Sequence, residues 1–305
     1  CRQCILKTLT FGIMLVLMGC SSTKNASTSE ISDFITIWKT TTANERITIP
    51  TNATVGEYNY SVDWGDASVD TELKGNAQHE YAQAGTYTIK ISGVFPAIYF
   101  MDLALAYDGT AGSDESFIKI FSIENWGNIE WATMSGAFFG CANLQVNAQD
   151  SPNLLKVRDM SYMFCYAESL HADFNDWNVS NVHNMSGLFC CAQAFNGDIS
   201  TWNVSKVTDM SGMFYEARSF NADIRKWNVS KVTTMRGMFS FARSFNADIR
   251  KWNVSKVTDT SAMFGRAESF ANHDLSTWNV RNVVSYENFL SDAGLGNTEP
   301  NWPKN

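Results

Sequence analysis

The chain has 305 residues and a net charge of −8, with 45% hydrophobic and 18% charged residues. This composition is typical of globular proteins and excludes a globally disordered chain, and the length accommodates two domains or one long array. An acidic chain without a basic stripe also argues against nucleic acid as a partner.

The first twenty residues predict an export signal. Arg2 and Lys7 give a positive start, and residues 8–18 form an apolar run that is too short to span a bilayer as a mature helix. The run leads into the letters L-M-G-C ending at Cys20, which resemble the lipobox of bacterial lipoproteins. The resemblance implies cleavage before Cys20 and lipidation of this residue. The alternatives are a plain secretory signal and a membrane anchor.

A lipidated Cys20 would attach the chain durably to a membrane, because each buried methylene of several acyl chains contributes about 0.8 kcal/mol. Residues 21–33 are polar and predict a flexible tether. Ser21, in place of Asp, favours sorting to the outer membrane if the cell is Gram-negative. Because position 1 is Cys, we expect the start codon to lie upstream.

Residues 34–99 predict a small antiparallel β-sandwich. Apolar residues alternate with polar ones around residues 47–49, 58–64 and 87–91, which is the period of a strand with one buried face. The strings V-D-W-G-D at 62–66 and H-E-Y-A-Q-A-G-T-Y at 79–87 resemble the signature of PKD domains. Asp63 and Asp66 suggest either a calcium site or turn residues that bond their own backbone, and we favour the turn. His79 has no second His or Cys at ligand spacing, so we expect it to be packed.

Residues 100–116 are a predicted linker, and residues 117–295 repeat with a period of about 25. One column of tryptophans recurs every 25 residues, with a last step of 26: Trp177, Trp202, Trp227, Trp252 and Trp278. A column of phenylalanines repeats with the same spacing from Phe164 to Phe289. A fixed period in the twenties indicates a solenoid of about seven units, in which the tryptophans form a buried structural spine. Residues 296–305 would be a tail.

Each unit follows the pattern W-N-V-S-x-V-x-x-M-x-x-M-F-x-x-A-x-x-F. The in-out-in alternation of Trp227–Val229 predicts a strand, and the three-to-four spacing of apolar residues in Met235–Phe245 predicts a short helical turn. One strand and one turn per unit is the leucine-rich-repeat plan. The string A-F-F-G-C-A-N-L at 137–144 and the later units resemble the repeats of BspA-family surface lipoproteins.

Three polar columns are candidates for a functional role, and we expect the contact area on the predicted sheet face of Ile224–Val229 and the equivalent residues of other units. The asparagine column predicts either a hydrogen-bonded ladder or a strip that contacts ligand. The aspartate column (Asp173, Asp198, Asp223, Asp248 and Asp274) predicts turn caps, with a calcium ladder as the alternative. Four adjacent basic residues predict either a solvated face or a patch for an acidic partner. The candidate binding residues are Asn178, Asn203, Asn228, Asn253, Arg225, Lys226, Arg250 and Lys251.

The remaining reactive residues give no catalytic pattern. Cys141 takes a small buried position and is expected to be an inert thiol. Cys165 and Cys190 share a column, so a disulfide is possible between them, with Cys191 as a competing partner. The four histidines are scattered, no metal-spaced cluster or phosphate loop occurs, and we expect neither an enzyme nor a cofactor.

The sequence therefore predicts a mainly β protein with short helical turns: a PKD-like sandwich followed by a leucine-rich-repeat-type solenoid. We expect a lipid-anchored cell-surface protein that adheres to an extracellular protein or glycan and binds no nucleic acid. The alternative is a passive envelope or coat lipoprotein without a specific ligand. An accessory module of a carbohydrate-active enzyme is a weaker prediction, because no exposed aromatic platform stands out in the sequence.

Overall fold

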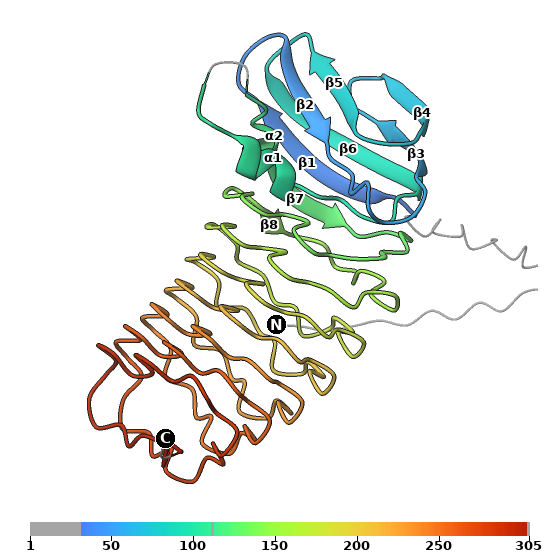
Figure 1. The fold of residues 1–305 in the computed structure, drawn as a ribbon. Helices are drawn as coiled ribbons and strands as arrows, with labels where there is room; N and C mark the ends of the chain where they lie inside the picture. Colours follow the sequence, from blue (N-terminus) through green and yellow to red (C-terminus); the bar gives the residue numbers. More distant parts are fainter. Residues whose placement is uncertain (1–31, 111–112, 304–305) are drawn as a thin grey trace, which may run out of the picture. The chain divides into compact units, whose positions relative to one another are not determined.

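The structure is a computed structural model that describes residues 32–110 and 113–303. These residues form a mainly β fold with few helical residues (Figure 1). The strands and helices are β1 (Phe34–Thr40), β2 (Glu45–Ile49), β3 (Asn59–Asp63), β4 (Val69–Leu73), β5 (Ala77–Tyr81), β6 (Gly85–Val94), α1 (Met101–Ala106), α2 (Ser116–Lys119), β7 (Ile120–Asn125) and β8 (Gln145–Val146).

Two open sheets form the N-terminal part. The larger sheet has the order β4-β3-β6-β1-β7-β8, and the smaller one pairs β2 with β5. All pairs are antiparallel except β7 with β8, which are parallel. The strands predicted around residues 47–49, 58–64 and 87–91 are present as β2, β3 and β6. Their alternation is confirmed in β3, where Tyr60 and Val62 are buried between more exposed neighbours.

The larger sheet runs directly into the repeat units. β7 lies in the first unit, yet it pairs with β1 on one side and with β8 on the other. Phe100 lies 6.3 Å from Phe138 between ring centroids, and Trp126 lies 6.1 Å from the same ring. One hydrophobic cluster extends from Phe34 to Phe289. The N-terminal part thus covers the ring of Phe138, the first in the phenylalanine stack. The predicted domain boundaries remain predictions.

Successive units stack through a regular backbone ladder (Figure 1). In the unit that contains Phe239, every second N–H donates to the following unit, for example Gly237 N to Ser261 O at 2.8 Å and Phe239 N to Met263 O at 2.8 Å. The intervening N–H groups close turns, as from Ser240 N to Gly237 O at 3.1 Å. Every fourth residue along this segment has positive φ, and this conformation turns alternate amides toward the next unit. The residues with positive φ are Gly237 and Phe241 in this unit, and Gly212 and Glu216 in the unit before.

Two local predictions for the unit are wrong. Trp227–Val229 is not a strand, because Trp227 N bonds Ile224 O at 3.1 Å within a turn. The parallel bridges lie instead just before the methionines, as between Asp209 and Thr234 and between Thr234 and Asp259. The segment 235–245 is a series of turns rather than a helix, because a left-handed residue interrupts it.

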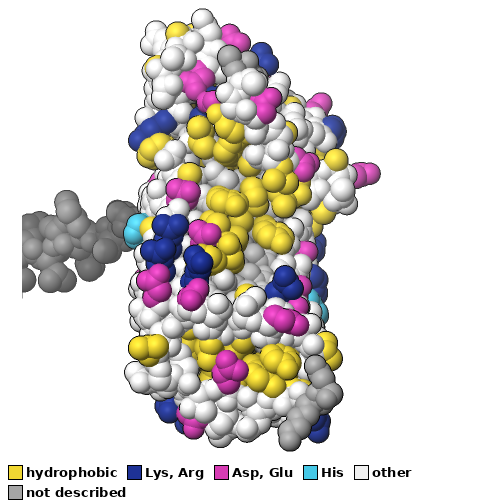
Figure 2. Space-filling view, turned by 60° about the vertical axis from the view of Figure 1, so that its left-hand side comes forward, with side chains coloured by type: hydrophobic (Ala, Val, Ile, Leu, Met, Phe, Trp, Pro, Cys, Tyr) yellow, Lys and Arg dark blue, Asp and Glu magenta, His cyan; other side chains and the backbone are white. Residues whose placement is uncertain are grey.

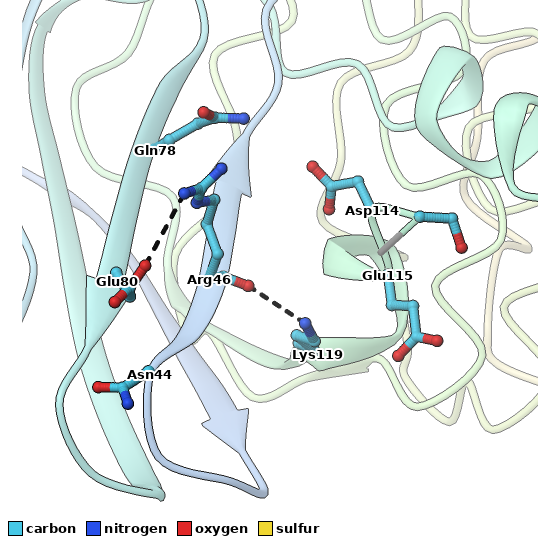
Figure 3. Close-up of a pocket in the computed structure, with 8 residues that line it drawn as sticks. Asn44, Arg46, Gln78, Glu80, Asp114, Glu115 and Lys119 are labelled. Atoms are coloured by element: carbon cyan, nitrogen blue, oxygen red, sulfur yellow. Dashed lines mark hydrogen bonds and ion pairs between the residues drawn. The ribbon is translucent and has the colours of Figure 1, made fainter. Parts of the chain in front are cut away.

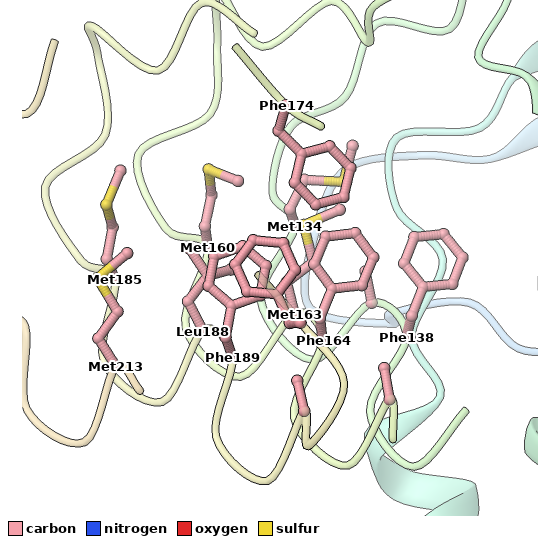
Figure 4. Packing of buried hydrophobic residues seen from close by; sticks show 14 of the residues in the cluster. Met134, Phe138, Met160, Met163, Phe164, Phe174, Met185, Leu188, Phe189 and Met213 are labelled. Atoms are coloured by element: carbon pink, nitrogen blue, oxygen red, sulfur yellow. The ribbon is translucent and has the colours of Figure 1, made fainter. Parts of the chain in front are cut away.

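Like side chains nevertheless lie on like side chains in the core (Figure 4). The rings of Phe138 and Phe164 are stacked with centroids 5.8 Å apart, and the Phe164–Phe189 pair has the same spacing. All five spine tryptophans are buried. Parallel stacking joins Trp202 to Trp227 at 6.3 Å and Trp227 to Trp252 at 6.5 Å, whereas Trp177 meets Trp126 edge to face at 5.3 Å.

The residues predicted as a tail close the far end of the stack. Trp302 stacks on Tyr286 at 4.5 Å and packs edge to face on Phe289 at 4.9 Å. Thr298 forms a parallel bridge with Asp274 and donates its N–H to His273 O at 2.8 Å. Both ends of the aromatic core are therefore covered, as repeat arrays require.

Candidate functional site

The predicted binding residues all lie exposed in corresponding positions of successive units. Asn178, Asn203, Asn228 and Asn253 each follow a buried tryptophan and precede a buried valine. Because the units are in register, these side chains form one column on the turn that carries W-N-V-S. We call the exposed residues of these turns, from the position two before each Trp to the position four after it, the W-N-V-S face.

The asparagines of this face do not form the predicted ladder. Each Oδ1 accepts the backbone N–H two residues later, as in Asn228 with Ser230 N and Asn253 with Ser255 N, both at 3.2 Å. The ladder lies in another column: Asn196 Oδ1 accepts Asn221 N at 2.7 Å, and Asn221 Oδ1 accepts Asn246 N at 2.8 Å. The recurring letters F-N-x-D contained this signal.

The aspartate column caps turns, as predicted for most of its members. Asp198 Oδ1 accepts Ser200 N at 2.9 Å and Asp274 Oδ1 accepts Ser276 N at 3.0 Å. Asp173 differs, because it accepts Asp198 N of the next unit at 2.7 Å. Within residues 32–110 and 113–303, no group of three or more His, Cys, Asp or Glu side chains has the arrangement of a metal site.

Two of the four predicted basic residues are paired with acids of their own unit. Arg225 lies 2.8 Å from Asp223, and Arg250 lies 2.8 Å from Asp248. Hydrogen bonds from these guanidinium groups lower the pKa of both carboxyl groups. Lys226 and Lys251 are exposed, and the ion pairs of the described chain do not include them. In the turns at Trp227 and Trp252 the free positive charge therefore resides on lysine.

A second lysine column escaped the sequence analysis. Lys206, Lys231 and Lys256 stand four residues after their tryptophans, and all are exposed. Lys206 Nζ donates to Asn181 Oδ1 of the preceding unit at 2.7 Å, which shows that side chains of this column reach along the stack. The letters S-K-V that recur in three units were the available signal. The prediction that the chain has no basic stripe is wrong.

An aromatic edge was also missed. Tyr166 is 47% exposed and packs edge to face on Phe139 at 5.6 Å, and Tyr107 packs likewise on Phe117 at 5.4 Å. Together with Leu105 these rings line an apolar pocket of about 380 Å³. Figure 2 shows hydrophobic side chains gathered into a band on this side of the molecule. The variable positions of M-F-x-x-A supply several of these rings, and sequence periodicity could not show that they face outward.

The cysteines of the repeat units are free thiols. Cys141 is buried, which raises its pKa well above the usual value. Cys190 Sγ lies 3.7 Å from Cys191 Sγ. A hydrogen bond with the Cys165 thiol raises the pKa of Cys190 to about 12. The predicted Cys165–Cys190 disulfide is absent from the structure, and protonated thiols with raised pKa values are poor nucleophiles.

The turn of residues 63–68 lies beside a packed histidine, as expected. His79 Nε2 lies 2.8 Å from Asp66 Oδ2, and the imidazole stacks on Trp64 with centroids 4.9 Å apart. Asp63 Oδ1 accepts Gly65 N at 3.0 Å, and Asp66 Oδ1 accepts Ser68 N at 3.1 Å. These are the turn bonds that we favoured over calcium ligands.

A polar pocket of about 380 Å³ lies between β2, β5 and residues 113–119 (Figure 3). Its basic groups already have protein partners: Arg46 lies 3.8 Å from Glu80, and Lys119 lies 3.0 Å from Glu45. Lys119 also donates to Arg46 O at 3.1 Å. Because these basic groups are already paired, we assign the pocket no ligand.

The predicted lipidation residue, Cys20, lies outside the described residues. Among residues 32–110 and 113–303, no helix has both the length and the apolar character needed to cross a bilayer.

The fold and the site define a repeat protein made of stacked units of about 25 residues that expose regular polar columns. The chain belongs to the family described as Mycoplasma protein of unknown function, DUF285, whose model matches residues 132–229 and 198–302. Each match spans about four units, and the two overlap because the units repeat in register. No curated protein and no solved structure matches the chain.

Proposed function

We propose that this protein is a non-catalytic binding protein of the bacterial cell surface, which is lipid-anchored through Cys20. Its repeat units would form a leucine-rich-repeat-type solenoid of the BspA-like kind, and its N-terminal sheets a PKD-like module. Residues 21–33 would hold the folded part away from the membrane. The outer membrane is the expected location if the cell is Gram-negative.

The ligand would be an extracellular protein or glycan that contacts the W-N-V-S face. The observation that carries this proposal is the repetition of one exposed surface: Asn178, Asn203, Asn228 and Asn253 lie in register, while the residues on either side of each are buried. A repeated array offers many equivalent contacts to an extended ligand, whereas catalysis needs one asymmetric arrangement.

The experiment uses the protein that begins after Cys20. It should retain specific ligands from a glycan array or from an extracellular extract, and a chain with the W-N-V-S face altered should lose them. A passive envelope protein, the alternative function, would retain none above the background of an unrelated repeat protein. Anchoring is tested separately: Cys20→Ala should move the exported protein from the detergent phase to the aqueous phase.

A further inference from the structure

We propose that five lysines of the W-N-V-S face form a docking stripe for a linear anionic polysaccharide. We call Lys206, Lys226, Lys231, Lys251 and Lys256 the lysine stripe. The inference rests on the proposed function, in which this face binds an extracellular ligand, and it names the chemistry of that ligand.

The register of the units places these lysines in two neighbouring rows. The indole rings of Trp227 and Trp252 are parallel with centroids 6.5 Å apart, so Lys226 and Lys251, which precede them, lie one unit apart. Lys231 and Lys256 repeat at the same step. Between the rows stands the asparagine column. The turns at Trp227 and Trp252 therefore each present an amide between two ammonium groups, and the turn at Trp202 adds Lys206 alone.

The stripe is rich in hydrogen-bond donors, and the carboxylates nearest to Lys226 and Lys251 in sequence are already engaged. Asp223 and Asp248, the acids of these turns, are paired with Arg225 and Arg250 at 2.8 Å. Asn228 uses its Oδ1 to accept Ser230 N, which leaves the amide N–H groups to face outward. A surface of ammonium and amide donors fits a ligand that carries carboxylates or sulfates together with hydroxyl and ether oxygens.

The positive charge is concentrated in a chain whose net charge is −8. The indoles next to Lys226 and Lys251 have centroids 6.5 Å apart, so the step between units is shorter than the Debye length of about 8 Å at physiological ionic strength. Like charges at this spacing repel one another. An anionic polymer that runs along the stack would relieve this repulsion at every unit it crosses.

The buried rings of this face favour a polysaccharide over single-stranded nucleic acid. Proteins that bind single strands without sequence preference stack the bases on exposed aromatic side chains. Here Trp202, Trp227 and Trp252 are only 3–4% exposed, so no ring is available for stacking. The exposed rings, such as Tyr166, belong to the separate aromatic edge.

The chain itself supplies suitable substitutions for a test. Thr201 and Thr277 occupy the column of Lys226 and Lys251, so Lys226→Thr/Lys251→Thr should leave the fold unchanged. The matched control is Arg218→Gln/Arg243→Gln. This control also removes two positive charges. Arg218 and Arg243 are exposed, and Gln193 occupies the equivalent position of an earlier unit, so glutamine is accepted there. Both arginines are paired with acids, Glu216 and Glu268, and therefore contribute no free charge.

The probe is a heparin-derived decasaccharide, with neutral dextran and an oligothymidylate of equal charge for comparison. We expect the lysine variant to bind the decasaccharide about tenfold more weakly, the arginine control to change less than about twofold, and all binding to weaken with salt. Circular dichroism melts should match for the three proteins. Equal loss in the control, unchanged binding of the lysine variant, or oligothymidylate binding as tight as that of the decasaccharide would overturn the assignment.

The two proposals fail in different ways. If the lysine variant binds extracellular extract as well as the unchanged protein does, the stripe assignment fails and the proposed function stands. If the unchanged protein retains nothing from the extract or the glycan array, the proposed function fails, whatever the decasaccharide shows.

Discussion

The change Trp227→Ala tests the stacking of the units most severely. Trp227 is 4% exposed and lies between two parallel indoles, Trp202 at 6.3 Å and Trp252 at 6.5 Å. Its Nε1–H donates to Ile199 O of the preceding unit at 3.1 Å. Truncation removes on the order of 200 Å² of buried surface and leaves a cavity between two rings. It also leaves a buried carbonyl without its donor, a loss of about 1–3 kcal/mol when no water replaces it.

We expect Trp227→Ala to lower the free energy of unfolding by about 3–5 kcal/mol. The control is Lys226→Ala at the neighbouring exposed position, which should change it by less than about 0.5 kcal/mol. Urea unfolding followed by circular dichroism measures both. If the two variants have the same midpoint and slope, the indoles do not couple adjacent units, and the stacking described here is incorrect.

Three further changes probe the backbone, the charge and the cap. Gly187 and Gly212 both have φ near +60°, but a Cβ on Gly187 would lie 2.4 Å from the Tyr162 ring, while the nearest atom to one on Gly212 is 3.8 Å away. Gly212→Ala should therefore lower the free energy of unfolding in urea by about 1 kcal/mol, and Gly187→Ala should lower it by at least about 1 kcal/mol more. Equal losses would contradict the close approach of Gly187 to the Tyr162 ring. Partial burial would raise the pKa of Asp66, but hydrogen bonds from Ser68 and His79 outweigh it and lower this pKa to about 2. A carboxyl whose pKa is lowered by folding stabilises the fold above its unfolded value of about 3.9 and loses this effect as pH falls toward 2. Between pH 5 and 2, the urea midpoint should thus fall less steeply for Asp66→Asn than for the unchanged protein. An equal fall in both proteins would refute the lowered pKa of Asp66. Trp302→Ala should lower the free energy of unfolding by about 2 kcal/mol, because it uncovers the rings of Tyr286 and Phe289. It should also speed proteolysis near residue 290. An unchanged cleavage rate would show that the C-terminal residues do not cap the stack.

The sequence predicted the core well, because a fixed period places identical side chains in one column. The burial of Trp227, Phe239 and their counterparts follows from the period of 25 alone. The position of the backbone ladder does not. It depends on residues with positive φ, and these positions hold Gly237 and Phe241 in one unit but Ala262 and Arg266 in the next. Because these positions hold several residue types and not glycine alone, the sequence does not reveal that they have positive φ.

The surface was predictable in composition and not in pairing. Two asparagine columns have the same period, and only the geometry shows that Asn221 joins units while Asn228 caps its own turn. The acidic and basic columns were visible in the letters, yet the pairing of Arg225 with Asp223 depends on a turn that bends the side chains together. Periodicity shows which residues share a column, whereas the backbone conformation decides what each column contacts.

Amide hydrogen exchange with and without the decasaccharide would test the central functional claim most directly. The account predicts that bound polysaccharide slows exchange at residues 202–206, 227–231 and 252–256, and leaves exchange at the aromatic edge around Tyr166 unchanged. Protection at the aromatic edge, or none on the W-N-V-S face, would contradict it.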